Sequence, residues 1–555
     1  MSGRIARTLT DSHGPARTLP VRRLIQATCL AGFLVLFFWM CWPYGSKQYA
    51  EAFRAREIVD AELFLILDPL TSISTAVAGR MVVWSLAAGA GAMLVGVLLP
   101  RAFCGYVCPL GTLFDVFDRL IGRRERPHGR WTRMRFVLLA IVLVAAVFGL
   151  LLSGFVAAIP VLTRAMLFVL APVQTGLLKG WYLVPPANVG HVLSIVLIAL
   201  MFGLSLLGRR FWCSYLCPTG ALLSLCSLLR LTERRVTGKC VQCGRCVGAC
   251  SFAAIREDFS TRTLSCASCR ACRGACPAGA IEFPWRWSGA KHAGEVDLSR
   301  RGVLAGLGGA AALGVGLPLA IGDGIEPREL PIRPPGSVPE DKFLQLCVRC
   351  GLCIKVCPNN VLQPAGFELG FNGLWTPKVV ADWSGCEPSC NNCGQVCPTG
   401  AIRALSLEEK KAARIGLAEI DCGACLPHVG REACQLCVDE CRMAGYNAIE
   451  FVRVGGEVGE KGEPLDGSGY LAPVVREDRC VGCGLCQMRC RSINVKSRKL
   501  LDASAIRVVA GSGREDRIVS GSYRGLAEER AGQRQQRNRV EEETGGTEYL
   551  PDFLR

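Results

Sequence analysis

The sequence predicts a polytopic α-helical membrane half joined to two small cysteine-rich α+β modules. Three observations predict this fold class. Half of the 555 residues are hydrophobic, so the chain can supply several membrane spans. Apolar stretches alternate with arginine-rich loops, as in multi-pass membrane proteins. Most of the 32 cysteines lie in tight Cys-x2-Cys-x2-Cys runs, whose thiols are poor disulfide partners but good ligands for one compact metal centre.

The membrane half, residues 21–230, contains four predicted spans. They run from Leu24 to Trp42, from Met81 to Leu99, from Phe136 to about Phe155 and from His191 to Leu207. Prolines and basic residues interrupt the apolar stretch 159–180, and we interpret it as an interfacial or half-inserted helix. A full span there is the alternative, and it would place the arginines that follow on the outer side. The loop that contains Asp60, Glu62 and Asp68 is expected on the outer side.

The formal net charge of +17 is concentrated beside the apolar stretches. The excess of lysine and arginine lies in residues 1–23, 101–135 and 209–301. The positive-inside rule therefore predicts that these segments face the cytoplasm. Because the excess flanks the spans, no nucleic-acid partner is predicted. Residues 1–20 are polar and basic and are expected to form a disordered N-terminus.

An internal repeat relates two segments of the membrane half. Residues 101–111 match residues 210–220 at a constant offset of 109, and each copy contains a Cys-x3-Cys-Pro motif. The four cysteines of these motifs are Cys104, Cys108, Cys213 and Cys217. If the copies pack by pseudo-symmetry, the four thiols converge on one metal, cofactor or redox site; the alternative is that they are reduced structural thiols. The isolated Cys29, Cys41 and Cys226 are expected to be ordinary apolar residues.

The first cysteine-rich module, residues 231–290, contains two complete Cys-x2-Cys-x2-Cys-x3-Cys runs. In two-cluster ferredoxins the fourth cysteine of each run binds the cluster of the other run. The predicted [4Fe–4S] ligands are Cys240, Cys243, Cys246 and Cys276 for one cluster and Cys266, Cys269, Cys272 and Cys250 for the other. A pair of zinc sites is the alternative, but such sites usually pair two Cys-x2-Cys knuckles across a longer loop. The module is therefore expected to be a cytoplasmic, ferredoxin-like α+β iron–sulfur module.

The second cysteine-rich module, residues 343–500, has enough cysteines for four further clusters. The predicted quartets are Cys347, Cys350, Cys353 with Cys397; Cys386, Cys390, Cys393 with Cys357; Cys425, Cys434, Cys437 with Cys490; and Cys480, Cys483, Cys486 with Cys441. In the third quartet Cys422 is an alternative to Cys425, which is favoured because it leaves the shorter loop to Cys434. The chain is thus expected to hold six [4Fe–4S] clusters.

Residues 297–322 are expected to link the two halves as a fifth span. They begin with two arginines and continue with about twenty uncharged residues, which suffice to cross a bilayer core. A Pro-rich linker, residues 323–342, follows and would space the second module from the membrane. That module would then lie in the periplasm, opposite the first one. Residues 511–555 are rich in Gly, Arg, Gln and Glu and are expected to be mostly disordered.

With these motifs in view, the chain resembles a fusion of two ferredoxin-type subunits of periplasmic nitrate reductase systems. Residues 20–285 resemble the NapH type, with paired Cys-x3-Cys-Pro motifs and a ferredoxin pair. Residues 297–500 resemble the NapG type and the related methylamine-utilisation ferredoxins, with a twin-arginine start. The resemblance implies a protein of the bacterial inner membrane that passes electrons from membrane quinol to a periplasmic redox partner protein. It also implies that the twin-arginine segment addresses the second module for export.

The quinol site is expected in the membrane half. Asp68, His191 and Tyr106 are candidate proton-handling residues for quinol oxidation. A reductase for periplasmic metal-cofactor maturation is an alternative within electron transfer. A redox-sensing membrane regulator is the alternative from another class, although no kinase or DNA-binding segment is evident in the sequence.

Overall fold

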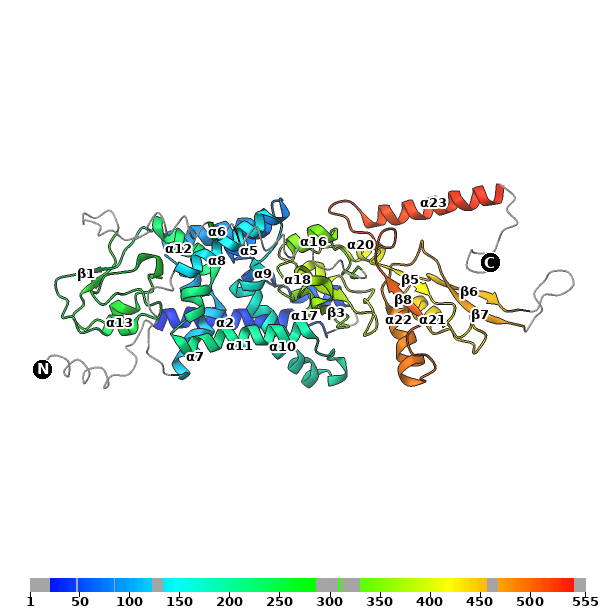
Figure 1. Cartoon of the computed structure of the whole chain (residues 1–555), viewed down its shortest axis with the longest axis horizontal. Coiled ribbons are helices and arrows are strands. Elements are labelled where there is room, and N and C mark those ends of the chain that lie inside the picture. The colour runs from blue at the N-terminus through cyan, green and yellow to red at the C-terminus, as the bar shows by residue number, and fades with distance from the viewer. Residues whose placement is uncertain are drawn as a thin grey trace.

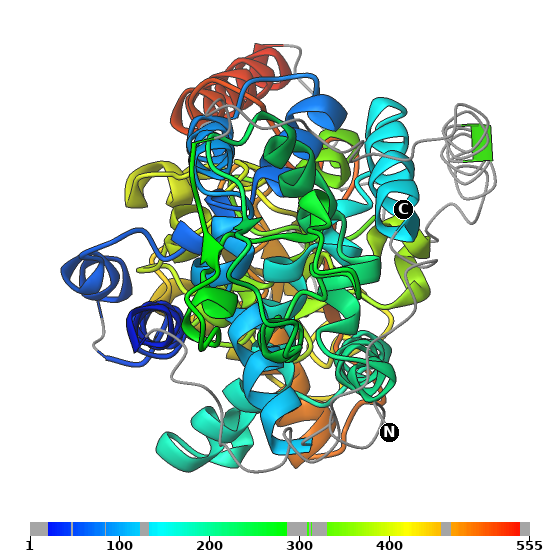
Figure 2. The same cartoon turned by 90° about the vertical axis from the view of Figure 1, so that its left-hand side faces the viewer.

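The computed structural model of the chain describes residues 20–45, 48–83, 85–121, 133–285, 308–309, 312, 330–456 and 468–543. An apolar helical half occupies the middle of an elongated molecule, with the first cysteine-rich module at one end and the second module at the other (Figure 1). Figure 2 looks from the first-module end and shows that module across the centre of the view, in front of the helices. Nearly all of the predicted fifth span, residues 297–322, lies outside the described residues.

The helical half consists of long apolar helices joined by short ones. Its elements are α2 (Pro20–Val35), η1 (Leu36–Met40), α3 (Tyr49–Arg56), α4 (Leu63–Ile66), α5 (Pro69–Gly79), α6 (Ser85–Leu98), η2 (Phe103–Val107), α7 (Pro109–Ile121), α8 (Met134–Val147), α9 (Ser153–Val156), α10 (Ala158–Leu178), η4 (Trp181–Leu183), α11 (Val189–Leu204), η5 (Ser205–Leu207), η6 (Trp212–Leu216), α12 (Pro218–Cys226) and η7 (Ser227–Leu229). Among the described residues, three stretches are long and apolar enough to cross a membrane: Val21–Met40, Ala158–Leu178 and Val189–Leu207.

These helices differ from the predicted spans in three places. The second predicted span forms the shorter helix α6, whose 14 residues are not among these stretches. The third predicted span ends early, because α8 stops at Val147 and the chain turns before α9 begins. The stretch expected to be interfacial or half-inserted forms the single 21-residue helix α10, which is long enough to cross a membrane. Pro160 is tolerated there because it lies in the first helical turn, where its missing N–H has no intrahelical partner to lose. Arg164 is tolerated because its buried guanidinium donates to carbonyl oxygens.

The sequence repeat is also a structural repeat. Helices α6 and α11 are each followed by a π-helical segment, η2 or η6, and then by a helix that begins with proline, α7 or α12. Arg101 and Arg210 occupy equivalent positions and share a left-handed backbone, with φ of 52° and 47°. In α7, the buried carboxylate of Asp115 pairs with the guanidinium groups of Arg22 and Arg210. This ion triad joins the first copy of the repeat to the second.

Asp68 is buried inside the helical half, although the sequence places it in an outer loop. Its carboxylate accepts the Leu70 N–H at the start of α5 and the Thr219 hydroxyl at the start of α12, at 3.1 and 3.2 Å. The side chain is 0% exposed. The apolar residues of α4 and α5 on either side of Asp68 account for this burial, because the chain buries them against α6 and α10.

The first module is a small two-fold unit. Strand β1 (Arg235–Val236) pairs with β2 (Ile281–Glu282), and the short helices α13 (Arg245–Ala249) and α14 (Ala271–Gly274) lie within the two cysteine runs and carry the third cysteine of each. A short 3-10 turn, η8 (Thr263–Ser265), precedes the second run.

The second module contains three antiparallel strand pairs, β3–β4, β5–β8 and β6–β7. Its elements are α16 (Glu340–Leu346), α17 (Leu352–Lys355), β3 (Leu362–Pro364), η9 (Phe367–Leu369), α18 (Gly370–Gly373), β4 (Pro377–Val379), α19 (Asn392–Gln395), α20 (Leu407–Ala412), β5 (Leu417–Ile420), α21 (Leu436–Met443), β6 (Ile449–Val454), β7 (Tyr470–Val475), α22 (Leu485–Cys490), η10 (Arg491–Ser497) and β8 (Ile506–Val509).

The described part of the predicted linker, residues 330–342, belongs to the second module. Arg333 is 1% exposed and pairs with Glu340 at the start of α16. The Lys342 ammonium donates to the Gly79 carbonyl at the end of α5, at 3.1 Å. The prediction of a spacer is therefore wrong for these residues, and the module packs directly on the helical half. The buried Arg333–Glu340 ion pair fixes this segment in the module, although its prolines favour an extended spacer.

The expected disordered tail contains a helix, α23 (Tyr523–Glu543). Tyr523 is fully buried against Leu405 and Ala413, and its N–H donates to Glu409 at 2.6 Å. One buried aromatic ring thus anchors a helix whose composition alone is typical of disorder. Residues 544–555 lie outside the described residues.

Replacing Asp115 with asparagine is expected to lower the free energy of unfolding by about 3–5 kcal/mol, because two buried guanidinium groups would lose their counter-charge. Arg22 and Arg210 lie 2.9 and 2.6 Å from the carboxylate. Thermal unfolding of the detergent-solubilised chain measures the loss. Glu408→Gln, which breaks an exposed pair with Arg524, is the control, with a change below about 1 kcal/mol. Equal effects of the two changes would contradict this role of Asp115.

Candidate metal centres

In the first module, four thiols from both cysteine runs surround one cavity. The cavity has a volume of about 330 Å³. Its cysteines are Cys240, Cys243, Cys246 and Cys276. The fourth thiol comes from the second run because α13 and α14 turn each run back toward its partner. This is the crossed arrangement that the spacing predicts.

The second quartet of the first module lies against the helical half. Cys266 interacts electrostatically with Cys250, Cys269 and Cys272, and burial raises the pKa of the Cys266 thiol to about 12. Cys250 and Cys266 pack with Cys104 of the helical half around Phe252, Ala254 and Ala267. The second quartet is therefore the one that adjoins a Cys-x3-Cys-Pro motif.

Three cavities of similar size in the second module are each lined by four cysteines. The volumes are about 380, 340 and 370 Å³. The quartets are Cys357, Cys386, Cys390, Cys393; Cys441, Cys480, Cys483, Cys486; and Cys425, Cys434, Cys437, Cys490. In the remaining quartet, Cys353 interacts electrostatically with Cys347, Cys350 and Cys397. Four of the predicted quartets thus line cavities of about 330–380 Å³, and the thiols of the other two quartets interact electrostatically; thiolate donors around such cavities fit [4Fe–4S] clusters.

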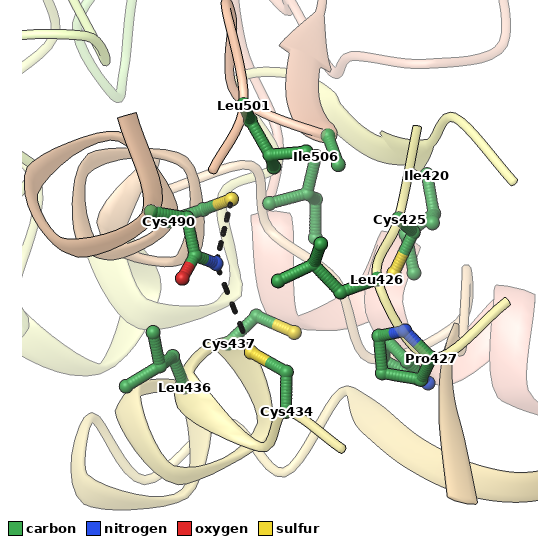
Figure 3. Close-up of a pocket in the computed structure, with 13 residues that line it drawn as sticks. Ile420, Cys425, Leu426, Pro427, Cys434, Leu436, Cys437, Cys490, Leu501 and Ile506 are labelled. Carbon is green, nitrogen blue, oxygen red and sulfur yellow. Dashed lines mark hydrogen bonds between the residues drawn. The ribbon is translucent and has the colours of Figure 1, made fainter. Parts of the chain in front are cut away.

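The structure separates the two alternative ligands of the least regular quartet. Cys425 lies at the cavity with Cys434, Cys437 and Cys490 (Figure 3). The thiol of Cys422 is instead directed to the Ile420 carbonyl, at 3.9 Å. Burial raises the pKa of the Cys425 thiol to about 11, so a metal that binds there must displace a proton.

Hydrogen bonds to the last sulfur of a run recur in both modules. The Sγ atoms of Cys250, Cys276, Cys397 and Cys441 accept backbone N–H groups at 3.2–3.4 Å. Cys490 differs because the chain after it remains helical in η10. The side-chain amide of Asn494 donates to Cys490 and Cys434 instead, as the dashed lines in Figure 3 show. Such bonds tune cluster potentials, and no sequence signal marked Asn494 for this role.

A buried lysine lies between two quartets of the second module. Lys410 is 3% exposed, and its ammonium donates to the Glu387 carbonyl. It interacts electrostatically with Cys386, Cys390 and Cys483, and these thiols hold the pKa of Lys410 above its ordinary value. The Cys386 N–H also donates to the Cys483 carbonyl at 2.7 Å. The two quartets are therefore adjacent, with a cation beside both.

The two Cys-x3-Cys-Pro copies face each other in the helical half. Arg210 donates to the Cys104 carbonyl, and Arg101 donates to the Cys213 carbonyl, both at 3.3 Å. Cys217 interacts electrostatically with Cys104, Cys108 and Cys213. The structure thus brings together the four thiols that the repeat predicted to converge.

The three candidate proton-handling residues lie apart. His191 caps α11 through Asn188 and stacks on Phe168, at the end of α11 next to the second module. Tyr106 lies in η2 and interacts electrostatically with Cys269 of the first module. Asp68 interacts electrostatically with the motif thiol of Cys108.

The isolated cysteines lie in apolar surroundings. Cys41 and Cys226 are buried, and Cys29 is half-buried. Within the described residues, no group of three or more His, Cys, Asp or Glu side chains is arranged to hold a single metal ion.

Family models match both halves of the chain. One described as a 4Fe-4S binding domain matches residues 81–128 and 190–235, and one described as a 4Fe-4S dicluster domain matches residues 346–401. No solved structure matches. The two matches of the first model each contain one Cys-x3-Cys-Pro motif.

Curated relatives are ferredoxin-type proteins. The methylamine utilization ferredoxin-type protein MauM of Methylorubrum extorquens is 35% identical over 182 residues, which are 32% of this chain and 72% of the relative. The ferredoxin-type protein NapG of Escherichia coli is 34% identical over 198 residues, 34% of this chain and 78% of the relative. The methylamine utilization ferredoxin-type protein MauN of Paracoccus denitrificans is 32% identical over 196 residues, 33% of this chain and 60% of the relative.

Cys425→Ser is expected to remove one cluster, about four iron atoms per chain, because it deletes a thiolate at the cavity. Cys422→Ser is the matched control and is expected to keep the full iron content, because its thiol is directed away. Iron and acid-labile sulfide in the purified chain measure both. Iron loss in the Cys422 variant alone would reverse the assignment.

Proposed function

The chain belongs to the family of MauM- and NapG-type ferredoxin proteins and is an iron–sulfur electron-transfer protein, and from this we propose that it passes electrons from membrane quinol to a periplasmic acceptor. The resemblance to NapG-type and methylamine-utilisation ferredoxins, which the cysteine motifs indicated, is thereby confirmed. The proposal includes six [4Fe–4S] clusters, held by the quartets described above. It also includes a multi-pass location in the bacterial inner membrane, with the first module cytoplasmic and the second periplasmic.

The observation that carries the proposal is the position of the apolar helical half between two cysteine modules (Figure 1). At one end, Cys104 packs with Cys250 and Cys266. At the other end, Arg164 donates to the Arg349 carbonyl, between Cys347 and Cys350. Cysteine sites therefore contact the helices from both ends, as a transmembrane electron carrier requires.

The second module approaches the helices very closely. A Cβ added at Gly154 would lie 2.6 Å from the Val348 carbonyl oxygen, so only glycine allows this contact. Arg349 also donates to the Leu151 carbonyl, at 2.8 Å. Phe155 stacks on Phe371 with ring centroids 4.8 Å apart. The quartet that begins at Cys347 is thereby held against the helical half.

The proposal places the quinol head group at a small apolar cavity of this interface, whose walls would have to move apart to admit it. The volume of the cavity is about 230 Å³, and aromatic and aliphatic side chains of α2, η1 and α4 line it. Thr163 of α10 is a polar residue in its wall, and Leu352, next to Cys353, closes it on the module side. Quinone sites are mostly apolar with a few polar groups, and this cavity adjoins a predicted cluster ligand.

Ala61→Leu is expected to slow quinol-driven cluster reduction at least about tenfold, because it fills the cavity that Ala61 lines. The bleaching of cluster absorbance after duroquinol is added to membranes measures the rate. Ala90→Leu, on the exposed side of α6, is the control. Dithionite should still reduce the clusters in both variants. An undiminished duroquinol rate in the Ala61 variant would place the quinol site elsewhere.

Reporter domains at the two ends of the chain are expected in opposite compartments. A reporter fused before residue 1 should be cytoplasmic, and one inserted after Gly456, between β6 and β7, should be periplasmic. Alkaline phosphatase and green fluorescent protein reporters distinguish the compartments. The same compartment for both reporters would end the transmembrane route.

A further inference from the structure

We propose that the two Cys-x3-Cys-Pro motifs together bind one iron–sulfur centre, in addition to the six ferredoxin-type clusters. Cys104, Cys108, Cys213 and Cys217 would supply its four thiolates. The inference rests on the proposed electron-transfer function only for its role, since the site itself is argued from geometry. The 4Fe-4S binding family model matches each copy separately, but each copy supplies only two motif cysteines. A four-thiolate centre therefore requires both copies.

The two copies are locked face to face by reciprocal contacts. Arg210 of the second copy donates to the Cys104 carbonyl and to the Gly111 carbonyl of the first, at 3.3 and 2.9 Å. Arg101 of the first copy donates to the Cys213 carbonyl of the second, at 3.3 Å. Each thiol pair is thus held beside the other by an arginine that crosses between the copies.

The second cysteine of each motif has the same backbone geometry in the two copies. Cys108 and Cys217 leave the π-helical segments with extended backbone, at ψ of 113° and 112°. Each then stands at the N-terminus of a helix, α7 or α12, whose dipole favours a thiolate. The Gly220 N–H donates to the Cys217 sulfur at 3.4 Å. These are the features of thiolate ligands rather than of cysteines that only fill space.

Buried positive charge surrounds the four thiols. Arg101, Arg135 and Arg210 are each at most 1% exposed. Arg210 pairs with Asp115, whereas the described partners of Arg101 and Arg135 are carbonyl oxygens. The Nε atoms of Arg101 and Arg135 have no hydrogen-bond partner among the described residues.

Thiolate ligands would balance this charge. Arg135 interacts electrostatically with Cys104 and Cys217, and Arg210 interacts with Cys108 and Cys213. Buried cations without counter-charges are costly, and a centre held by four cysteinates is an anion. Two buried acids also lie at the site: Asp68, which is beside Cys108 and hydrogen-bonded to Thr219, and Asp115, which pairs with Arg210 and interacts electrostatically with Cys213.

The position of the site gives the centre its role. Phe252 of the first module lies between the two crossing arginines, 5.2 Å from the Arg101 guanidinium and 4.4 Å from that of Arg210. Cys104 packs with Cys250 and Cys266, predicted ligands of the nearest ferredoxin cluster. One electron at a time would pass between the centre and that cluster, one being oxidised as the other is reduced, with no bond made or broken. The centre would connect the helical half to the first module.

Iron analysis of the full chain tests the proposal. Cys108→Ser, Cys217→Ser and the double variant are each expected to lose the same amount of iron, about two to four atoms per chain, because they share one centre. Cys226→Ser, a buried cysteine outside the motifs, is the matched control and should lose none. Electron paramagnetic resonance should show the ferredoxin clusters unchanged after dithionite reduction. Unchanged iron in the three motif variants would overturn the proposal, and additive losses would show two separate metal sites.

A second variant keeps all four thiols. Arg135→Gln is expected to shift the centre to a more negative reduction potential while iron content stays constant, because it removes a nearby buried cation. Redox titration followed by electron paramagnetic resonance measures the shift, and an unchanged spectrum and potential would contradict a metal beside Arg135. Failure of duroquinol to reduce wild-type clusters would instead count against the proposed function, because the iron losses do not depend on the electron donor.

Discussion

Positive charge buried beside cysteines is the constraint on which this structure depends. Arg101, Arg135, Arg164 and Arg349 are each at most 1% exposed, and their described partners are carbonyl, hydroxyl or amide oxygens rather than carboxylates. A guanidinium in an apolar interior is tolerated only when nearby negative charge and hydrogen bonds replace water. At both ends of the helical half, the nearby groups able to supply that charge are cysteine thiols, once they are deprotonated by a bound metal.

Because the same residues contact both the thiols and the neighbouring module, the proposed cluster would link the assembly of the module to its docking. Arg349 belongs to the second module and donates to Leu151 of the helical half, while Arg164 of the helical half donates back to the Arg349 carbonyl. Both guanidinium groups interact with Cys347. Without the anionic cluster, docking would bury two cations together, which repel each other. The proposed cluster would supply the negative charge that offsets this repulsion.

The sequence predicted the parts of the molecule that follow from local spacing. Ligand quartets such as Cys357 with Cys386 depend on loop lengths within a ferredoxin run, and the structure groups the thiols as the crossing rule does. Likewise, the sequence repeat that relates Arg101 to Arg210 predicted the structural repeat. Residues that act through distant contacts left no such pattern. Asn494 and Lys410 are ordinary polar residues until the fold places their nitrogens beside sulfur or between quartets.

The limits of prediction at the linker and tail have the same physical origin. Composition describes how a segment behaves when nothing covers it. Arg333 and Tyr523 reverse the expectation because each is covered completely, by an ion pair with Glu340 in one case and by packing on α20 in the other. One fully buried side chain can therefore fix a segment whose composition favours an extended or disordered chain. The partner that buries this side chain is known only from the tertiary structure.

The broken symmetry of the repeat explains how a two-fold helical half binds a single first module. Asp115 in the first copy corresponds to Ser224 in the second, at the same offset of 109 residues. Arg210 is consequently held by a carboxylate, whereas its counterpart Arg101 directs Nη1 to the Ser265 carbonyl of the first module, at 3.2 Å. Asp115 thus holds Arg210 within the repeat, whereas Arg101 donates both to the Cys213 carbonyl of the second copy and to the first module. The geometry that the two copies share brings the four thiols together, and the difference between the copies accounts for the contact of Arg101 with the first module.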